Sequence, residues 1–204
     1  MKKIILTVAA VMALSTAAKA QDTNSGNVKL GIKAGLNVAT LTGEDVSDDV
    51  KSRVGFHAGV VAEFKVAPNF SIQPELLYSQ QGAKIDTFEE SFNVETTLKV
   101  NYLNLPVLAK YYIIKGLSIE AGPQIGYRLS SKMKVEVPGL GTDEIDFKDQ
   151  TKSIDFGLVG GVAYDLPMGV FFQARYNAGL SKINDDNDGS AKNGVFQVSV
   201  GYKF

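Results

Sequence analysis

The chain has 204 residues and a formal net charge of −1, and it contains neither cysteine nor tryptophan. A chain of this length predicts one domain, and a near-neutral charge offers no basic surface for nucleic acid. The lack of cysteine excludes a disulfide scaffold, thiol catalysis, a cysteine-based zinc site and a lipid anchor on an N-terminal cysteine.

The N-terminal segment has the three-part pattern of a secretory signal peptide. Lys2 and Lys3 precede an apolar run over residues 4–14, and residues 18–20 form a small-x-small cleavage site. The apolar run is too short to span a bilayer as a helix. The sequence therefore predicts a cleaved signal peptide over residues 1–20, so the mature protein would begin at Gln21.

Beyond the leader, apolar and polar residues alternate in eight segments. In the first of them Leu30, Ile32 and Ala34 share one face, and Lys33 and Gly35 share the other. A strand that crosses a membrane needs about nine to eleven residues, whereas globular strands are usually about five or six residues long. The predicted strands cover residues 30–38, 56–65, 70–79, 98–112, 117–129, 154–165, 170–181 and 195–204.

The connections between these strands are long and short in strict alternation. Three short turns contain Pro68, Gly116 and Pro167, and the polar connections over 42–53, 81–97, 130–152 and 182–193 are long and rich in acidic residues. Transmembrane barrels have short periplasmic turns and long extracellular loops. We therefore expect an all-β fold, an eight-stranded antiparallel up-and-down transmembrane β-barrel. The predicted division of the chain is the signal peptide (1–20), a periplasmic leader (21–27) and an outer-membrane β-barrel (28–204).

The two faces of the strands differ in bulk. The apolar face carries Phe, Tyr, Leu or Ile at most positions, which is too bulky for the narrow interior of an eight-stranded barrel. Its aromatic residues gather at two levels, as in the aromatic girdles of membrane barrels. The apolar face is thus expected to contact lipid in the outer membrane, which argues against a soluble lipocalin-like barrel.

The opposite face supplies charges of both signs to the lumen. We expect an internal salt-bridge network, with Glu120 paired to Arg128 or Arg175; the alternative is a proton or ion pathway. The candidate network residues are Lys33, Glu63, Glu75, Lys110, Glu120, Arg128, Asp155 and Arg175.

Four segments carry a resemblance to a known family. The chain resembles the small outer-membrane β-barrel family of Gram-negative bacteria called PorT-like or "porin family" proteins, which have an outer membrane protein beta-barrel domain. The resemblance implies the fold and the location, and it says little about activity. The segments are GIKAGLN at 31–37, QPELLY at 73–78, YLNLPVLAKY at 102–111 and GYKF at 201–204.

Little in the sequence predicts catalysis. His57 is the single histidine, and a lipid hydrolase would pair it with a serine such as Ser79 and an acid such as Glu63. No Gly-x-Ser-x-Gly motif is present. The acidic connections are either solvated tips or sites where divalent cations bridge to lipopolysaccharide phosphates. We expect no enzyme activity, no cofactor and no metal site.

The predicted protein is thus a non-enzymatic outer-membrane barrel with a closed polar lumen. Its acidic extracellular loops would have a structural role or bind a ligand or partner; the alternatives are a narrow conduit for small solutes or apolar compounds, and a membrane-embedded lipid-modifying enzyme that uses His57. The expected partners are outer-membrane lipid, lipopolysaccharide, the barrel assembly machinery and an extracellular or periplasmic protein. In the last strand, Tyr202 and Phe204 are expected to form the assembly signal.

Overall fold

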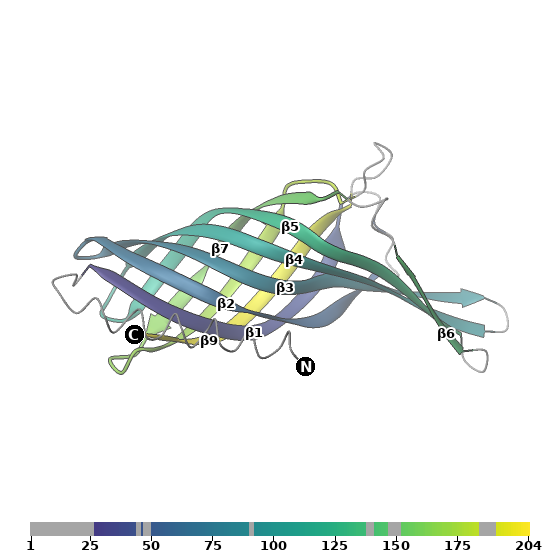
Figure 1. Cartoon of the computed structure of the whole chain (residues 1–204), viewed down its shortest axis with the longest axis horizontal. Coiled ribbons are helices and arrows are strands. Elements are labelled where there is room, and N and C mark those ends of the chain that lie inside the picture. Colours follow the sequence, from purple (N-terminus) through teal and green to yellow (C-terminus); the bar gives the residue numbers. More distant parts are fainter. Residues whose placement is uncertain are drawn as a thin grey trace, which may run out of the picture.

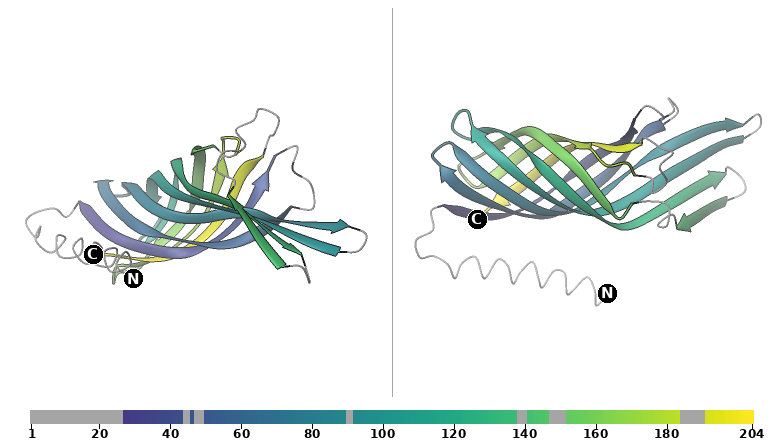
Figure 2. Two further views of the ribbon diagram at one scale, coloured as in Figure 1. Left: turned by 45° about the vertical axis from the view of Figure 1, so that its right-hand side comes forward. Right: turned by 90° about the horizontal axis from the view of Figure 1, so that it is seen from above.

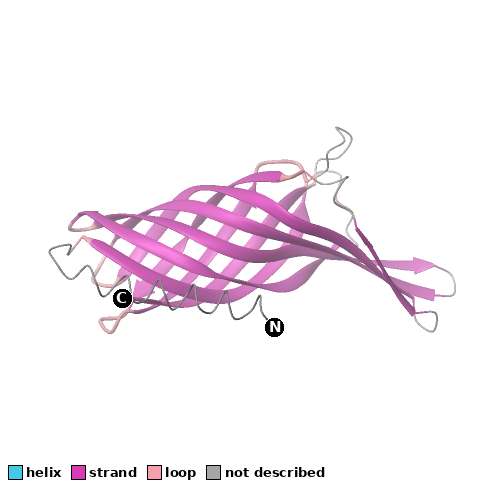
Figure 3. Ribbon diagram, viewed as in Figure 1, coloured by secondary structure: helices cyan, strands magenta, loops and turns pink. Residues whose placement is uncertain are grey.

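The described part of the chain is built almost entirely of β-strands (Figure 3). The computed structural model describes residues 27–43, 46, 50–89, 92–137, 141–146, 152–183 and 191–204. None of these residues belongs to a helix long and apolar enough to cross a membrane. The strands within these ranges are β1 (Val28–Thr42), β2 (Val50–Ala67), β3 (Phe70–Glu89), β4 (Phe92–Tyr112), β5 (Leu117–Val137), β6 (Gly141–Asp146), β7 (Ile154–Asp165), β8 (Val170–Gly179) and β9 (Lys192–Lys203) (Figure 1).

Eight of these strands close into an antiparallel barrel. Each pairs with the next along the chain, except that β5 pairs with β7 as well as with the short β6. The ring closes where β1 pairs with β9, with Ile32 opposite Tyr202 and Val38 opposite Phe196. The backbone N–H of Phe204 donates to the carbonyl of Leu30 at 2.7 Å at the end of this seam. The predicted eight-stranded up-and-down barrel is confirmed.

The side chains alternate between the outside and the lumen as the sequence predicts. On β1, Leu36 is 61% exposed whereas Lys33 is only 3% exposed. The same contrast holds on every barrel strand, because successive side chains of a strand point to opposite faces. An apolar outer surface is stable against hydrocarbon, so the barrel is suited to lie in a membrane with a polar interior.

Two of the predicted long loops are largely strand, and here the prediction is wrong. β3 and β4 run on through most of residues 81–97 to the pair Glu89 and Phe92, and β5 and β6 occupy much of residues 130–152. Together these outer parts form an extended sheet that continues beyond the barrel (Figures 1 and 2). In water both faces of such a sheet can carry polar side chains, so the alternation that marks a membrane strand is lost.

Several sequence predictions fall on residues that are not described. These are the signal peptide, residues 21–26 of the leader, and all the acidic residues of the first and last long connections.

Candidate functional site

The middle of the lumen is crossed by a buried ion-pair network. The Glu75 carboxylate on β3 accepts hydrogen bonds from Lys33 Nζ at 2.7 Å and from Arg175 Nη1 at 2.8 Å. Arg175 Nε also donates to Gln197 Oε1 at 2.7 Å. The three charged side chains are fully buried, so each charge depends on these partners rather than on water.

Glutamine side chains link this network to its neighbours. Lys33 Nζ donates to Gln173 Oε1 at 2.5 Å, and Gln173 Nε2 donates to Glu120 Oε1 at 2.6 Å. Gln73 links Glu75 to Lys110 in the same way, because Lys110 Nζ donates to Gln73 Oε1 at 3.3 Å and Gln73 Nε2 donates to Glu75 Oε1 at 2.8 Å. Amides can both donate and accept, so they join carboxylates and ammonium groups that do not touch directly.

The expected partners of Glu120 are not the ones it has. Arg175 donates hydrogen bonds to Glu75 and Gln197. Arg128 lies eight positions further along β5, about 26 Å from Glu120 at the usual strand rise. It is half-exposed near the outer rim, where it donates to Ser153 Oγ at 3.3 Å. Nearby, the buried Asp155 accepts from Asn193 Nδ2 at 3.2 Å.

His57 lies in a layer of polar side chains on the extracellular side of the ion pairs. Its Nδ1 is 2.7 Å from Asn37 Oδ1, and its Nε2 is 2.7 Å from Ser199 Oγ. The serine considered from the sequence, Ser79, instead accepts from Asn37 Nδ2 at 3.0 Å. Glu63 is six positions from His57 on β2, about 20 Å away. The constellation of His57, Ser79 and Glu63 is therefore not assembled.

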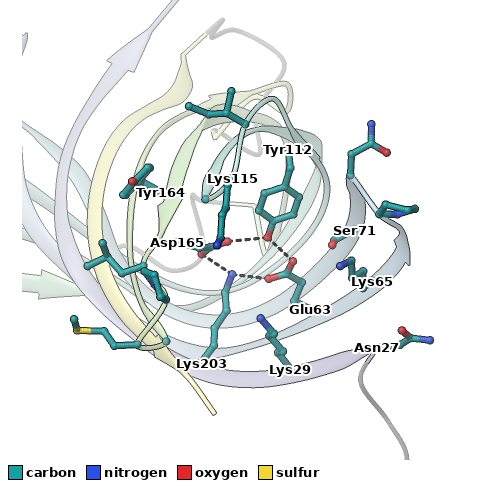
Figure 4. A pocket seen from close by; sticks show the side chains of 18 of the residues that line it. Asn27, Lys29, Glu63, Lys65, Ser71, Tyr112, Lys115, Tyr164, Asp165 and Lys203 are labelled. Atoms are coloured by element: carbon teal, nitrogen blue, oxygen red, sulfur yellow. Dashed lines mark hydrogen bonds and ion pairs between the residues drawn. The ribbon is translucent and has the colours of Figure 1, made fainter.

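A second charged cluster closes the periplasmic end of the lumen (Figure 4). Lys203 Nζ donates to Glu63 Oε2 at 2.5 Å and to Asp165 Oδ1 at 2.8 Å. The Tyr112 hydroxyl lies 2.5 Å from Glu63 Oε1 and 2.7 Å from Asp165 Oδ2. Lys110 Nζ is 3.5 Å from Asp165 Oδ2 and connects this cluster to the middle network.

This cluster is the floor of a pocket with a volume of about 950 Å³, which we call the periplasmic vestibule. Its wall is made by the start of β1, the end of β9 and the three short turns between strands. Among the described residues, no group of three His, Asp or Glu side chains is arranged to hold a metal ion.

Sequence reasoning missed several of these residues. Tyr112 is two positions from the inward-facing Lys110, so the alternation along the strand was a signal that could have found it. The same alternation places Gln197 and Ser199 inside the barrel, but it does not predict their contacts with Arg175 and His57. Tyr202 and Phe204 lie outside, with ring centroids 5.4 Å apart in an edge-on arrangement.

The closed barrel, its apolar outer surface and its charged lumen define a transmembrane β-barrel protein. The sequence matches the outer membrane protein beta-barrel domain family over residues 19–185. The chain belongs to this family, and its place is the outer membrane.

Solved outer-membrane barrels share the fold at low sequence identity. The attachment invasion locus protein Ail of Yersinia pestis is 14% identical with a TM-score of 0.54, and the match covers 87% of this chain and 99% of Ail. A second structure, of Ail in complex with the heparin analogue sucrose octasulfate, is 16% identical with a TM-score of 0.53 and the same coverage. Neisserial surface protein A is 15% identical with a TM-score of 0.50, covering 86% of this chain and 97% of that protein. No curated protein is similar enough in sequence to be matched.

Proposed function

We propose that this protein is a non-enzymatic outer-membrane barrel with a closed lumen, which binds a partner through its extended sheet on the extracellular side. The observation that supports the closed lumen is the contact of Glu75 with Arg175. These residues come from β3 and β8, which are not neighbours in the ring, so their side chains meet across the lumen. An interior of an eight-stranded barrel is only wide enough for its own side chains.

The conduit hypothesis is tested by planar-bilayer recording of the purified protein. We expect no sustained openings from the wild-type barrel. A variant that removes the crossing side chains, Lys33→Ala with Arg175→Ala, provides the positive control, because it frees space in the middle layer. Sustained wild-type openings of the same size as those of the variant would reject the closed lumen.

The enzyme hypothesis has one observation in its favour, the chain Ser199–His57–Asn37. Three features oppose it. All three side chains are buried in the lumen, the strand N–H groups around Ser199 are used in the β1–β9 pairing, and a Cβ added at Gly35 would lie 2.7 Å from His57 Cε1, so the imidazole is tightly packed. We expect no labelling of the folded barrel by a fluorophosphonate probe. Labelling that is lost in Ser199→Ala would establish a serine hydrolase.

The binding role rests on the extended sheet. It projects four strands beyond the membrane-spanning barrel, more than the closure of hairpins requires (Figure 2). Each of the four long connecting segments carries more acidic than basic residues. Ail binds a polyanion in its complex with sucrose octasulfate. The acidic composition here favours a basic partner instead.

A labelled lysine-rich peptide, added to the barrel in nanodiscs, tests this preference. We expect binding that weakens with salt and that is reduced when Asp86, Glu89, Glu90 and Glu95 are changed to their amides. Asp143→Asn with Asp146→Asn, on β6, shows whether the β3–β4 hairpin alone or the whole sheet is needed. Glu63 and Asp165 are not used as control positions, because they are ion-paired in the lumen and their substitution would disturb the barrel. Equal binding by every variant would contradict the role of the sheet.

The remaining expectations belong to the same proposal. Residues 1–20 act as a cleaved export signal, and the barrel assembly machinery inserts the chain among lipid and lipopolysaccharide. The four segments that resemble PorT-like proteins support a place in that branch of the family.

A further inference from the structure

The periplasmic vestibule has the size of a small-molecule site. Its volume of about 950 Å³ is at the upper end of the range usual for ligand pockets. The short turns that line it lie at the opposite end of the barrel from the extended sheet (Figure 1), so the proposed partner would not contact it.

The charged side chains on the floor of the vestibule are already paired with one another. Lys203 bridges Glu63 and Asp165, and the Tyr112 hydroxyl contacts both carboxylates. Glu63 and Asp165 are the acidic residues that line the pocket, among the described residues, and both are engaged. The floor therefore offers little attraction to a cation.

Three lysine side chains lie at the mouth of the vestibule. Lys29 on β1, Lys65 on β2 and Lys115 in the β4–β5 turn line the pocket and are exposed. Within the described part of the chain, the ammonium groups of these three lysines form no hydrogen bond or ion pair. Figure 4 shows these lysines together with the hydrogen-bonded cluster of the floor, and no dashed line joins them to it. Lysine is a usual ligand of phosphate and carboxylate groups.

The wall beside these lysines is apolar and open. Ile114 is 62% exposed and Met168 is 67% exposed, although both lie in turns that face the periplasm. Leu166 and Pro167 continue this surface along the β7–β8 turn. A hydrocarbon group that covers these side chains would remove apolar surface from water.

We propose that the vestibule binds an amphipathic anion. Lys29, Lys65 and Lys115 hold its phosphate or carboxylate, and its hydrocarbon part lies on Ile114 and Met168. Such an anion comes either from an anionic lipid of the inner leaflet or from a soluble amphiphile in the periplasm. The proposal stands apart from the proposed function, which concerns the lumen and the extracellular end.

Octyl phosphate is a suitable probe, added to the barrel in nanodiscs of zwitterionic phosphatidylcholine. Binding is followed by NMR through the amide resonances of Lys115 and Gly116, which report on this site and not on partition into the bilayer. We expect saturable shifts, with inorganic phosphate at least about tenfold weaker because it lacks the hydrocarbon part. Higher salt should weaken the binding of both.

Two variants divide the site into its parts. Lys29→Gln with Lys65→Gln and Lys115→Gln should weaken octyl phosphate at least about tenfold, since three charge contacts are lost. Ile114→Ser with Met168→Ser should weaken octyl phosphate but not inorganic phosphate. The matched control is Lys84→Gln with Lys99→Gln and Lys132→Gln, which removes the same charge at the other end and should bind as wild type. Unboiled electrophoretic mobility shows that each variant is folded.

The source of the anion is distinguished with nanodiscs that contain phosphatidylglycerol. If the lipid occupies the vestibule, the Lys115 and Gly116 shifts appear without octyl phosphate; if they do not, a soluble amphiphile is the ligand. The proposal is overturned if octyl phosphate gives no saturable shift in phosphatidylcholine nanodiscs, or if the folded vestibule variant binds it as tightly as the wild type.

Discussion

Arg175 Nη1 and Glu75 Oε2 are 2.8 Å apart, yet their strands are separated in the ring by β9, β1 and β2. The two side chains therefore meet across the barrel and connect opposite walls. Glu75 also holds Lys33, so one carboxylate serves two buried cations. Breaking a buried pair is costly because it leaves a charge without a partner.

The shared carboxylate predicts an order of stability effects. Glu75→Gln leaves both Lys33 and Arg175 without their anion and should lower the unfolding free energy by about 3–5 kcal/mol. Arg175→Met should cost less, because Lys33 remains with Glu75. Urea unfolding of the barrel in bilayers measures both. Lys132→Met, at an exposed ion pair, should change the value by no more than about 1 kcal/mol. Equal effects of the two buried substitutions would show that the carboxylate is not shared.

Two adjacent glycines on β7 should respond differently to alanine. A Cβ at Gly161 would lie 2.5 Å from Arg175 Cβ and 2.4 Å from the Ala174 carbonyl oxygen, whereas a Cβ at Gly160 would meet nothing within 4 Å. We expect Gly161→Ala to destabilise the barrel by about 1–3 kcal/mol through overpacking. Gly160→Ala, on the lipid face, should be close to neutral. The same urea titration compares them, and a similar loss in both would mean that lumen packing is not the cause.

Tyr202 and Phe204 are predicted to act in assembly rather than in stability. Deleting the last three residues would also remove Lys203, which holds Glu63 and Asp165, so substitution is the cleaner test. Tyr202→Ala with Phe204→Ala should reduce the amount of folded protein in the outer membrane. Tyr176→Ala, another lipid-facing aromatic, should not. The measurement is fractionation with heat-modifiable mobility; normal levels of the double variant would refute the assembly signal.

The extended sheet should loosen in acid. On β6, Glu144 accepts from Lys132 Nζ at 3.0 Å and from Lys99 Nζ at 3.4 Å. The hydrogen bond and charge of Lys132, followed by the hydrogen bond of Lys99, lower the pKa of Glu144 below its ordinary value of 4.5. A lowered pKa stabilises the fold above the ordinary value, and this contribution is lost as the pH falls through the lowered pKa.

Hydrogen exchange at β6 amides, corrected for the intrinsic effect of pH, measures this loss. Protection in the wild type should fall across that acidic range, while Glu144→Gln should have lower protection that does not change there. An identical pH profile in the two proteins would assign the effect to other groups.

The sequence predicts the faces of the strands well because one physical rule governs them. Ile32 and Lys33 differ by one position, and the lipid on one side and the polar lumen on the other require opposite side chains. Parity likewise places Glu75 and Arg175 inside the barrel. Their contact is not predictable in this way, because it depends on how far the strands are staggered around the ring.

The unknown stagger and register of the strands also explain the two main errors, which concern the partner of Glu120 and the extended sheet. Glu120 and Arg175 both point into the lumen, but the stagger of the strands brings Gln173, and not Arg175, to the Glu120 carboxylate. In the extended sheet, Lys132 and Glu144 face water, and no membrane imposes an alternation that would mark their strands. Cross-strand charge pairs were the remaining signal, and they can be recognised only once the register is known.

The β1–β9 seam has a consequence for the order of folding. Most strands pair with a neighbour that is close in sequence, whereas Thr42 and Lys192, which meet at the seam, are 150 positions apart. Local hairpins form at a small cost in loop closure, and this distant pairing has the largest cost. β1 therefore keeps one unpaired edge until β9 pairs with it. The barrel can close only when β9 is in place, and until then the free edge of β1 is able to pair with another strand.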